Sequence, residues 1–257
     1  MAIRKEMEID PAAEAERIAG FVRSELEGAG RSRIVLGISG GLDSATVALL
    51  CAQAVGPDNV LGFILPYRTS TPESAEHARA VAASAGIGCE SVDISPAVDA
   101  LRGMLPTDDR VRLGNLMART RMIVLYDRSA LHDALVAGTG NHTETLLGYA
   151  TLHGDSACAF APIAHLYKCQ VRQLAAHLGV PEDIIAKPPS ADLWQGQTDE
   201  GELGFAYDDI DWLLFNLLDA GKDAAALRAM GFDAEFIDTA KGRIAATEFK
   251  RRMPRSL

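Results

Sequence analysis

The sequence is short of positive charge and of cysteine, and each shortage excludes classes of function. Its 257 residues contain 25 lysines and arginines against 35 aspartates and glutamates, which gives a formal net charge of −10. Nucleic acids and membrane surfaces attract basic protein faces, so we expect neither as a partner. The four cysteines form no CxxC pair, so a zinc ribbon or a thioredoxin-type redox site is not expected.

Long apolar runs are missing as well. The longest mainly apolar stretch, Ala45 to Val55, is far too short to cross a bilayer and predicts a helix packed on a sheet. The N-terminal segment MAIRKEMEIDPAAEAER is charged throughout and lacks the apolar region of a signal peptide. We therefore expect no transmembrane segment and a cytoplasmic location.

Short apolar runs alternate with helical patterns along the chain. RIVLGI at 33–38 predicts the first strand, and the other predicted strands are 60–65, 90–94, 133–138 and a fifth near Ala159–Ile163. The main predicted helices are 43–55, 72–85, 109–130 and about 168–178. Apolar strands separated by helices predict one domain over 1–257, with a doubly wound, Rossmann-like parallel sheet of five strands and helices on both faces.

The segment from Lys187 to Gly204 breaks this alternation. It is polar and rich in proline, glycine and aspartate, which predicts a long loop. Loops of this length inside a compact domain often serve as lids over a binding site.

SGGLDS at 39–44 is the sharpest chemical signal, because it directly follows the first strand and opens a helix. Gly40 and Gly41 allow a tight turn whose N–H groups, with the helix N-terminus, can surround an anion. Ser39 and Ser44 add hydroxyl donors. The loop lacks the GKS or GKT ending of a Walker A motif, so it predicts a pyrophosphate cradle of another kind.

SGGLDS resembles the signature loop of the N-type ATP pyrophosphatases, which cleave ATP between the α and β phosphates. Within that superfamily, the rest of the chain from about residue 33 resembles the ammonia-dependent NAD synthetase family. The matching segments, in chain order, are GNLMARTRM (114–122), GTGNHTE (138–144), GYATLHGDSACAFAPI (148–163), LYKCQV (166–171), PSADLWQGQTDEGELGFAYDDID (189–211) and FKRRMP (249–254).

This resemblance implies a fold of the adenine nucleotide alpha hydrolase type and a homodimer with active sites near the subunit interface. It implies the last step of NAD biosynthesis, in which ATP adenylates the nicotinate carboxylate of deamido-NAD. Ammonia then displaces AMP from the NAD-adenylate, so that AMP and pyrophosphate are released. The expected substrates are ATP, deamido-NAD and ammonia, with Mg²⁺ as the cofactor.

The candidate metal and phosphate ligands follow the ends of predicted strands. Asp43 lies in the first helical turn after the phosphate loop, and Glu144 lies just beyond strand 133–138, at the edge where an open parallel sheet binds ligands. Two hard carboxylates there suit Mg²⁺. Lys168 begins a predicted helix, from which its ammonium can reach the α-phosphate during attack. The resemblance adds two further ATP contacts, Thr139 and Ser190.

The candidate contacts to deamido-NAD lie on the long helix and after it. Arg112, Asn115 and Arg119 fall at i, i+3 and i+7 and therefore share one helix face. The family resemblance implies that Asn115 and Arg119 contact this substrate, that Tyr149 stacks on the nicotinate ring, and that Asp155 holds or deprotonates ammonium.

The C-terminal segment matches the family at Lys250, which we expect to contact deamido-NAD. Three positions depart from the family pattern. Some NAD synthetases carry a lysine at Leu152, an acidic residue at Ala159 and a histidine at Phe249, so the substrate contacts made there are expected to differ in this chain.

Two other functions use the same loop. A tRNA-directed or sulfur-directed adenylating enzyme needs a basic RNA-binding face and reactive cysteines, which the sequence does not provide. A non-catalytic nucleotide sensor has no need to keep Asp43, Glu144 and Lys168 together. The pair His142 and Glu144 resembles the HxE of zinc deaminases, but no PCxxC follows. We expect no glutaminase domain, since no cysteine has the context of a nucleophile.

Overall fold

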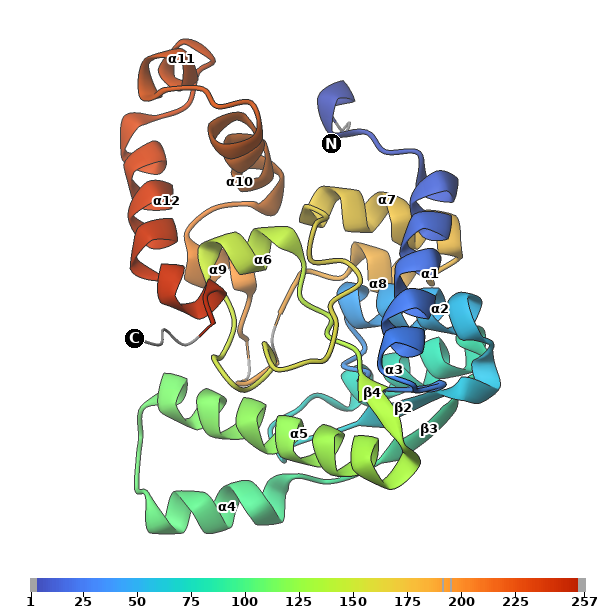
Figure 1. Ribbon diagram of the computed structural model, residues 1–257. Helices are drawn as coiled ribbons and strands as arrows, with labels where there is room; N and C mark the ends of the chain where they lie inside the picture. The colour runs from blue at the N-terminus through green and yellow to red at the C-terminus, as the bar shows by residue number, and fades with distance from the viewer. Residues whose placement is uncertain (1–3, 191, 195, 254–257) are drawn as a thin grey trace.

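The computed structural model (Figure 1) describes residues 4–190, 192–194 and 196–253. Ala191 and Gln195 of the expected lid, and Pro254 of the C-terminal segment that resembles the family, lie outside the described residues. Among the described residues, no helix is both long enough and apolar enough to span a membrane.

Four parallel strands form the central sheet. They are β1 (Arg33–Gly37), β2 (Val60–Ile64), β3 (Gly88–Ser91) and β4 (Ala134–Val136), in the order β3-β2-β1-β4. The chain builds outward from β1 through β2 to β3 and then returns to place β4 on the other side of β1. The strand order therefore reverses between β1 and β4, which is the position where open parallel sheets bind ligands.

The predicted fifth strand is wrong. Around Ala159–Ile163 the structure has one isolated bridge, between Ala137 and Phe160, instead of a strand. Two hydrogen bonds hold it, from the Gly138 N–H to the Phe160 carbonyl (2.8 Å) and from the Ala159 N–H to the Val136 carbonyl (2.8 Å). Pro162 has no N–H to donate, and the chain turns there. The expected parallel α/β arrangement is present, but with four strands.

Helices cover both faces of the sheet (Figure 1). One face carries α1 (Pro11–Gly28), α2 (Leu42–Val55), α3 (Pro72–Ala85) and α7 (Lys168–Leu178). The other face carries α4 (Ser95–Met104) and α5 (Arg110–His132). The predicted helices are therefore present with small shifts at their ends, and α4 is a helix that the sequence analysis did not predict.

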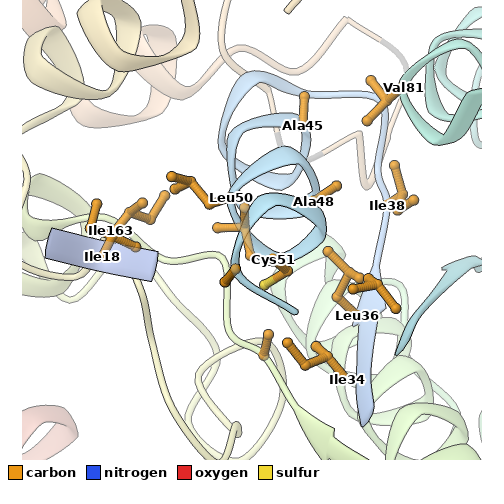
Figure 2. Packing of buried hydrophobic residues seen from close by; sticks show 14 of the residues in the cluster. Ile18, Ile34, Leu36, Ile38, Ala45, Ala48, Leu50, Cys51, Val81 and Ile163 are labelled. Carbon is orange, nitrogen blue, oxygen red and sulfur yellow. The ribbon is translucent and has the colours of Figure 1, made fainter. Parts of the chain in front are cut away.

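Alternation along β1 divides the core in two. Ile34, Leu36 and Ile38 pack with α1, α2 and α3, as Figure 2 shows for part of this cluster. Val35 points to the opposite face and packs with Phe63 and the apolar side of α5. Successive side chains of a strand point to opposite faces, so a strand covered on both faces must be apolar throughout.

The C-terminal part of the chain forms a helical layer beside the sheet. Its helices are α6 (His142–Leu147), α9 (Asp199–Leu203), α10 (Tyr207–Leu214), α11 (Ala224–Ala229) and α12 (Ala234–Ala246). Helix α8 (Glu182–Ala186) packs instead beside α7, in the core on the α2 face of the sheet. Shorter 3₁₀ segments are η1 (Lys5–Met7), η2 (Pro57–Asn59) and η4 (Glu248–Arg251), and a π-helical turn, η3 (Phe215–Asp219), follows α10. Helices α6, α10, α11 and α12 share an apolar cluster of their own.

The expected lid, 187–204, is partly helical because it contains α9. The Thr198 hydroxyl accepts a hydrogen bond from the Gly201 N–H (3.2 Å) and so caps this helix. Gly204, at φ +83°, ends it. A single short turn of helix is difficult to recognise in a polar sequence, because it buries too little to produce an apolar pattern.

β3 forms one edge of the sheet, and all four of its residues are exposed. The strand was predicted at 90–94 but begins and ends earlier, at Gly88 and Ser91. Val92, within the predicted range, continues the pairing through one hydrogen bond from its N–H to the Ile64 carbonyl (2.9 Å).

Candidate active site

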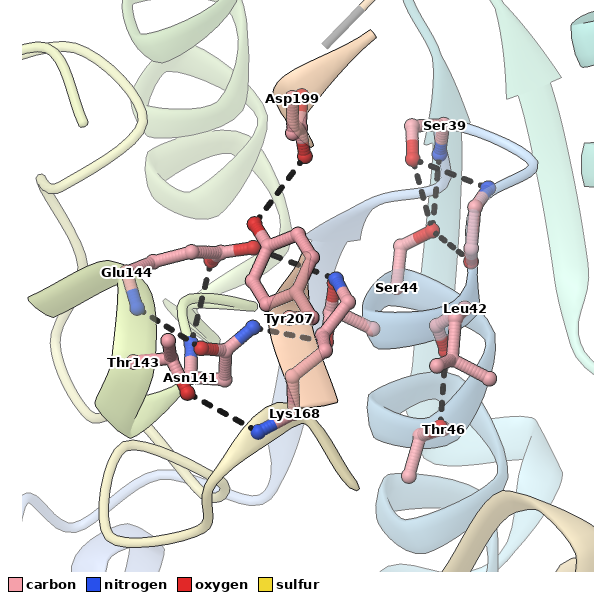
Figure 3. Close-up of polar contacts among 12 residues, drawn as sticks. Ser39, Leu42, Ser44, Thr46, Asn141, Thr143, Glu144, Lys168, Asp199 and Tyr207 are labelled. Atoms are coloured by element: carbon pink, nitrogen blue, oxygen red, sulfur yellow. Dashed lines mark hydrogen bonds and ion pairs between the residues drawn. The ribbon is translucent and has the colours of Figure 1, made fainter. Parts of the chain in front are cut away.

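The loop after β1 is held in shape by the two serines of SGGLDS. The Ser44 hydroxyl accepts a hydrogen bond from the Ser39 N–H (3.1 Å) and donates one to the Gly41 carbonyl (3.1 Å). The Ser39 hydroxyl accepts from the Gly41 N–H (3.2 Å) and lies 3.0 Å from that of Ser44 (Figure 3). The expected phosphate loop is therefore a compact turn that leads into the first turn of α2.

Gly40 is required by this turn. Its φ is +78°, and a Cβ at this position would lie 2.2 Å from the Ser74 carbonyl oxygen of α3. Both the left-handed backbone and the close approach of α3 exclude a side chain. Gly41 serves as the N-cap residue of α2 without any capping side chain, so the N-terminal N–H groups of the helix are directed toward the loop.

Lys168 lies between two carboxylates. Its ammonium forms ion pairs with Asp43 of α2 and with Glu144 of α6, the latter at 3.3 Å. The lysine side chain is 3% exposed, and those of Asp43 and Glu144 are 16% and 18% exposed. The structure thus brings together three predicted site residues that are separated by up to 125 positions in the chain.

Burial and charge act against each other in this cluster. Burial lowers the pKa of Lys168, but the charges of Asp43 and Glu144 outweigh burial, and the pKa lies above its ordinary value. Burial raises the pKa of Glu144 to about 8, and the Lys168 charge opposes that rise only in part. The ammonium is therefore stably charged, and it lies beside two acidic groups that water reaches only poorly.

Asn141 fixes Glu144 and Asp43 relative to each other. It caps α6 by accepting a hydrogen bond from the Glu144 N–H (3.0 Å), and the Glu144 carboxylate accepts one from the Asn141 N–H (3.3 Å). The Asn141 amide also donates to Asp43 (3.2 Å). Asn141 therefore both closes the capping box of α6 and joins the start of α6 to the first turn of α2.

Aromatic and acidic groups of the helical layer close the other side of the cluster. The Tyr207 ring lies 5.2 Å from the Lys168 ammonium, and its hydroxyl donates to Asp199 of α9 (3.3 Å, Figure 3). The Tyr149 hydroxyl donates to Asp199 (3.1 Å) and to Glu202 (2.8 Å). Tyr149, expected to stack on nicotinate, thus holds α9 of the expected lid through its hydroxyl.

The expected deamido-NAD contacts gather where α5 meets the loop 149–156. Asn115 accepts a hydrogen bond from the Thr151 hydroxyl (2.8 Å), and the Arg119 guanidinium donates to the Leu152 carbonyl (3.2 and 3.3 Å). The Asp155 carboxylate accepts from the Thr151 N–H (2.8 Å). Arg112, one turn before Asn115, is exposed.

Lys250 reaches the same loop from the C-terminal segment. Its ammonium donates to the carbonyls of Gly148 and Ala150, both at 2.8 Å. Nearby, a groove of about 450 Å³ includes two of the positions that depart from the family pattern. It is lined by Leu152, His153, Ala245, Glu248, Phe249, Arg252 and Met253. The third departure, Ala159, lies at the isolated bridge beyond β4.

The two remaining predicted ATP contacts lie at the margins of the cluster. Thr139 is half-buried and lies two residues after the bridge residue Ala137. Ser190 is exposed, and its hydroxyl accepts a hydrogen bond from the Asp192 N–H (3.1 Å). The Asp192 carboxylate in turn accepts from the Thr71 N–H (3.2 Å), so the lid segment is joined to the start of α3.

Several residues of the cluster were not predicted from the sequence. One of them had a local signal, because Asn141 followed three residues later by Glu144 is a capping-box pattern. The others depend on contacts between distant helices, which no local pattern reveals. These residues are Thr143, Asp199, Tyr207 and Asp211.

The side chains of the site can be compared with what a metal ion requires. Among residues 4–190, 192–194 and 196–253, no group of three or more histidine, cysteine, aspartate or glutamate side chains is arranged to hold one. The site offers two such carboxylates, those of Asp43 and Glu144, and both bind the Lys168 ammonium. Their hard oxygens are of the type that Mg²⁺ prefers, and an ion that keeps several waters and takes its other ligands from phosphates needs only one or two carboxylates. The residues present therefore fit such an ion.

The chain is similar to known proteins over most of its length. The family model described as NAD synthase matches residues 14–254. An NH(3)-dependent NAD(+) synthetase of Trichlorobacter lovleyi is 51% identical over 237 residues, which cover 92% of this chain and 87% of that protein.

Two solved structures share the fold over nearly the whole chain. The NH3-dependent NAD synthetase from Campylobacter jejuni, in complex with the nitrate ion, has a TM-score of 0.84 and 34% identity, covering 97% of this chain and 100% of that one. An NMN synthetase from Francisella tularensis has a TM-score of 0.87 and 30% identity, covering 97% and 99% of the two chains.

Gly40→Ala should damage nucleotide binding specifically. The added methyl group would clash with the Ser74 carbonyl at a left-handed position, so we expect ATP binding to weaken about tenfold or more, equivalent to roughly 1.4 kcal/mol. Titration with ATP, followed by calorimetry, measures the change. Gly221→Ala is the matched control, because Gly221 has φ +63° in open space. Equal affinities in the two variants would contradict the role given to the loop.

Proposed function

The chain belongs to the NAD synthase family, and on that premise we propose that it is an ammonia-dependent ligase that amidates deamido-NAD at the expense of ATP. ATP transfers AMP to the nicotinate carboxylate and releases pyrophosphate. Ammonia then displaces AMP from the NAD-adenylate and leaves the amide. The observation that carries this proposal is the cluster of Asp43, Glu144 and Lys168 beside the SGGLDS loop.

The first step must bring two anions together. A carboxylate can attack the α-phosphate only where the negative charge is compensated and the reacting groups are aligned. The N–H groups at the start of α2 and the Ser39 and Ser44 hydroxyls are proposed to hold the phosphates. The ammonium of Lys168 is proposed to move from its carboxylate partners to the α-phosphate, where charge increases during the attack.

Mg²⁺ is the proposed metal of this site, and Asp43 and Glu144 would hold it. The support is that both carboxylates already bind one cation, the Lys168 ammonium. When bound, Mg²⁺ supplies charge compensation for the triphosphate. Lys168 keeps the two carboxylates compensated when no other cation is present.

The second step requires protection from water, since the mixed anhydride is easily hydrolysed. Helix α9 and the segment before it are proposed to act as a lid, held by the hydrogen bonds from Tyr149 and Tyr207 to Asp199. Asp155 is proposed to receive ammonium near the acyl carbon. Asn115, Arg119, Tyr149 and Lys250 are the proposed contacts to deamido-NAD.

We propose that the active unit is a homodimer formed through α4 and α5. The support is the concentration of exposed, large apolar side chains on these two helices and directly after α4. They are Met104, Leu105, Val111, Ile123, Tyr126 and Leu131. Arg119 and Asn115 lie on the same helix α5, so a dimer of this kind would bring the deamido-NAD contacts near the subunit interface. The proposed cell compartment is the cytoplasm.

The function is tested by identifying products and nitrogen source together. With ATP, Mg²⁺, deamido-NAD and ammonium, the protein should form NAD, AMP and pyrophosphate in equal amounts. The rate should increase from pH 7 to pH 9 at fixed total ammonium, because the fraction of neutral NH₃ increases. Purified glutamine should not replace ammonium, and the mononucleotide form of the acid should be a poorer substrate.

Each other outcome excludes part of the proposal. ADP and phosphate as products would exclude the ATP pyrophosphatase class. Efficient turnover on glutamine alone would exclude dependence on ammonia. A preference for the mononucleotide would move the chain toward the activity named for the Francisella tularensis relative. Nucleotide binding without any product would favour a sensor.

Asp43→Asn and Glu144→Gln should each reduce kcat about 100-fold or more, since one electrostatic contact to the reacting groups typically contributes that much. Both variants keep the size of the side chain and so the packing, and we expect a folded protein with a lowered melting temperature, because Lys168 loses one charged partner. Circular dichroism and steady-state kinetics measure the two effects separately. Glu27→Gln, an exposed change at the end of α1, serves as the control. Unfolding of the site variants at room temperature would show that these carboxylates are structural.

Arg119→Ala should raise the KM for deamido-NAD about tenfold, the loss expected for one charged hydrogen bond. The KM for ATP should change less, because Arg119 lies on α5, away from the SGGLDS loop in the chain and bonded to the loop 149–156. Initial rates with each substrate varied at saturating levels of the others give both constants. A larger change for ATP would reassign Arg119 to the nucleotide.

A further inference from the structure

Asp211 is a buried acid to which neither the phosphate loop nor the proposed substrate contacts assign a role. It lies on α10 and is 0% exposed. Burying a carboxylate is costly unless its oxygens are hydrogen-bonded. Both oxygens are bonded here, to the Thr143 hydroxyl at 2.6 Å and to the Cys169 N–H at 2.8 Å.

These partners are the immediate neighbours of two reactive side chains. Thr143 precedes Glu144 in α6, and Cys169 follows Lys168 in α7. The Thr143 hydroxyl donates to Asp211 and accepts from the Lys168 N–H (3.1 Å, Figure 3). The first two N–H groups of α7 are therefore bonded by Thr143 and Asp211, with the negative charge at the helix end that favours it.

The hydrogen bonds close a ring around the reactive groups. Asn141 caps α6 and Thr143 lies in its first turn. Asn141 also donates to Asp43 of α2. Asp43 binds the Lys168 ammonium at the end of its side chain, and Thr143 binds the Lys168 N–H at its base. Thr143 and Asp211 thus link the helix that carries Glu144 to the helix that begins at Lys168.

Helix α10 contributes twice to this arrangement. Tyr207 and Asp211 are separated by four residues and therefore share one helix face. Tyr207 places its ring 5.2 Å from the Lys168 ammonium, while Asp211 holds the N-terminus of α7, where Lys168 begins. A long lysine side chain has many rotamers. The hydrogen bonds that hold the Lys168 backbone and the Tyr207 ring beside its ammonium both limit the positions that the ammonium can take.

We propose that Asp211 and Thr143 are positioning residues, which set the distance between Glu144 and Lys168 for adenylate formation; this proposal rests on the proposed function of the site. Neither residue is among the proposed substrate contacts. They act through α6 and α7, in the way that partners of metal ligands and catalytic groups hold those groups in their productive geometry.

The test compares Thr143→Val and Asp211→Asn with Thr143→Ser. Valine keeps the shape of threonine without the hydroxyl, asparagine keeps the size of aspartate without the charge, and serine keeps the hydroxyl. We expect kcat to fall about 10- to 100-fold in the first two variants, the range for lost partners of site ligands. The KM for deamido-NAD should stay at the wild-type value, and Thr143→Ser should retain most of kcat.

A control separates positioning from stability. Ile237→Ala removes a buried side chain (1% exposed) of the same helical layer, so it should lower the melting temperature while kcat of the folded enzyme is kept. The increase in melting temperature on adding ATP with Mg²⁺ is measured for every variant, and it should be smaller for Thr143→Val and Asp211→Asn than for Ile237→Ala.

Wild-type kcat in Thr143→Val and Asp211→Asn, with only the melting temperature lowered, would overturn the proposal. If Thr143→Val does not fold, the other two variants test the proposal. A reduced kcat in Asp211→Asn together with a retained kcat in Thr143→Ser supports it, and a wild-type kcat in Asp211→Asn contradicts it. Wild-type protein is assayed in parallel. If it forms no AMP and pyrophosphate, the proposed function fails, and the shift in melting temperature with ATP and Mg²⁺ still tests the positioning.

Discussion

The arrangement of the site depends on the buried ammonium of Lys168, which forms ion pairs with acidic groups of two different helices. The ammonium compensates Asp43 on the sheet side and Glu144 on the side of the helical layer. Removing one partner of a buried ion pair commonly costs about 3–5 kcal/mol, because the other charge is left without compensation. Lys168 therefore makes the burial of both acidic groups tolerable, and their charges in turn favour its charged form. All three groups lie where charged substrates are proposed to bind.

Sheet topology explains why these groups meet. Asp43 lies in the first turn of α2, which follows β1, and Asn141 and Glu144 lie at the start of α6, which follows β4. Strands β1 and β4 are neighbours in the sheet. Helix α7 packs against α2, which brings Lys168 toward the same edge. The site therefore follows from the sheet topology. The segments after two adjacent strands and the N-terminus of α7 meet at the same edge of the sheet.

The sequence predicted those parts that have a local pattern. Apolar strands and helices of regular length predicted the parallel sheet and its two covered faces, and SGGLDS predicted the turn at Gly40. The prediction of a fifth strand was wrong. The apolar composition around Phe160 does not reveal that Pro162 and the following turn end the pairing after one bridge. Asp211 and Tyr207 were not predicted as site residues because their roles depend on how α10 packs against α7, a contact between elements distant in the chain. The phosphate and substrate contacts assigned by resemblance remain predictions.

The exposed edge of the sheet has a consequence for the behaviour of the protein at high concentration. An unpaired edge strand can recruit a strand from another molecule and so begin aggregation. β3 is only four residues long, and its exposed side chains include Glu90 and Ser91. A second strand that paired there would have to cover a carboxylate and would find no apolar stripe to bury. The edge therefore disfavours strand pairing between copies, and the sheet should stay four-stranded at high protein concentration.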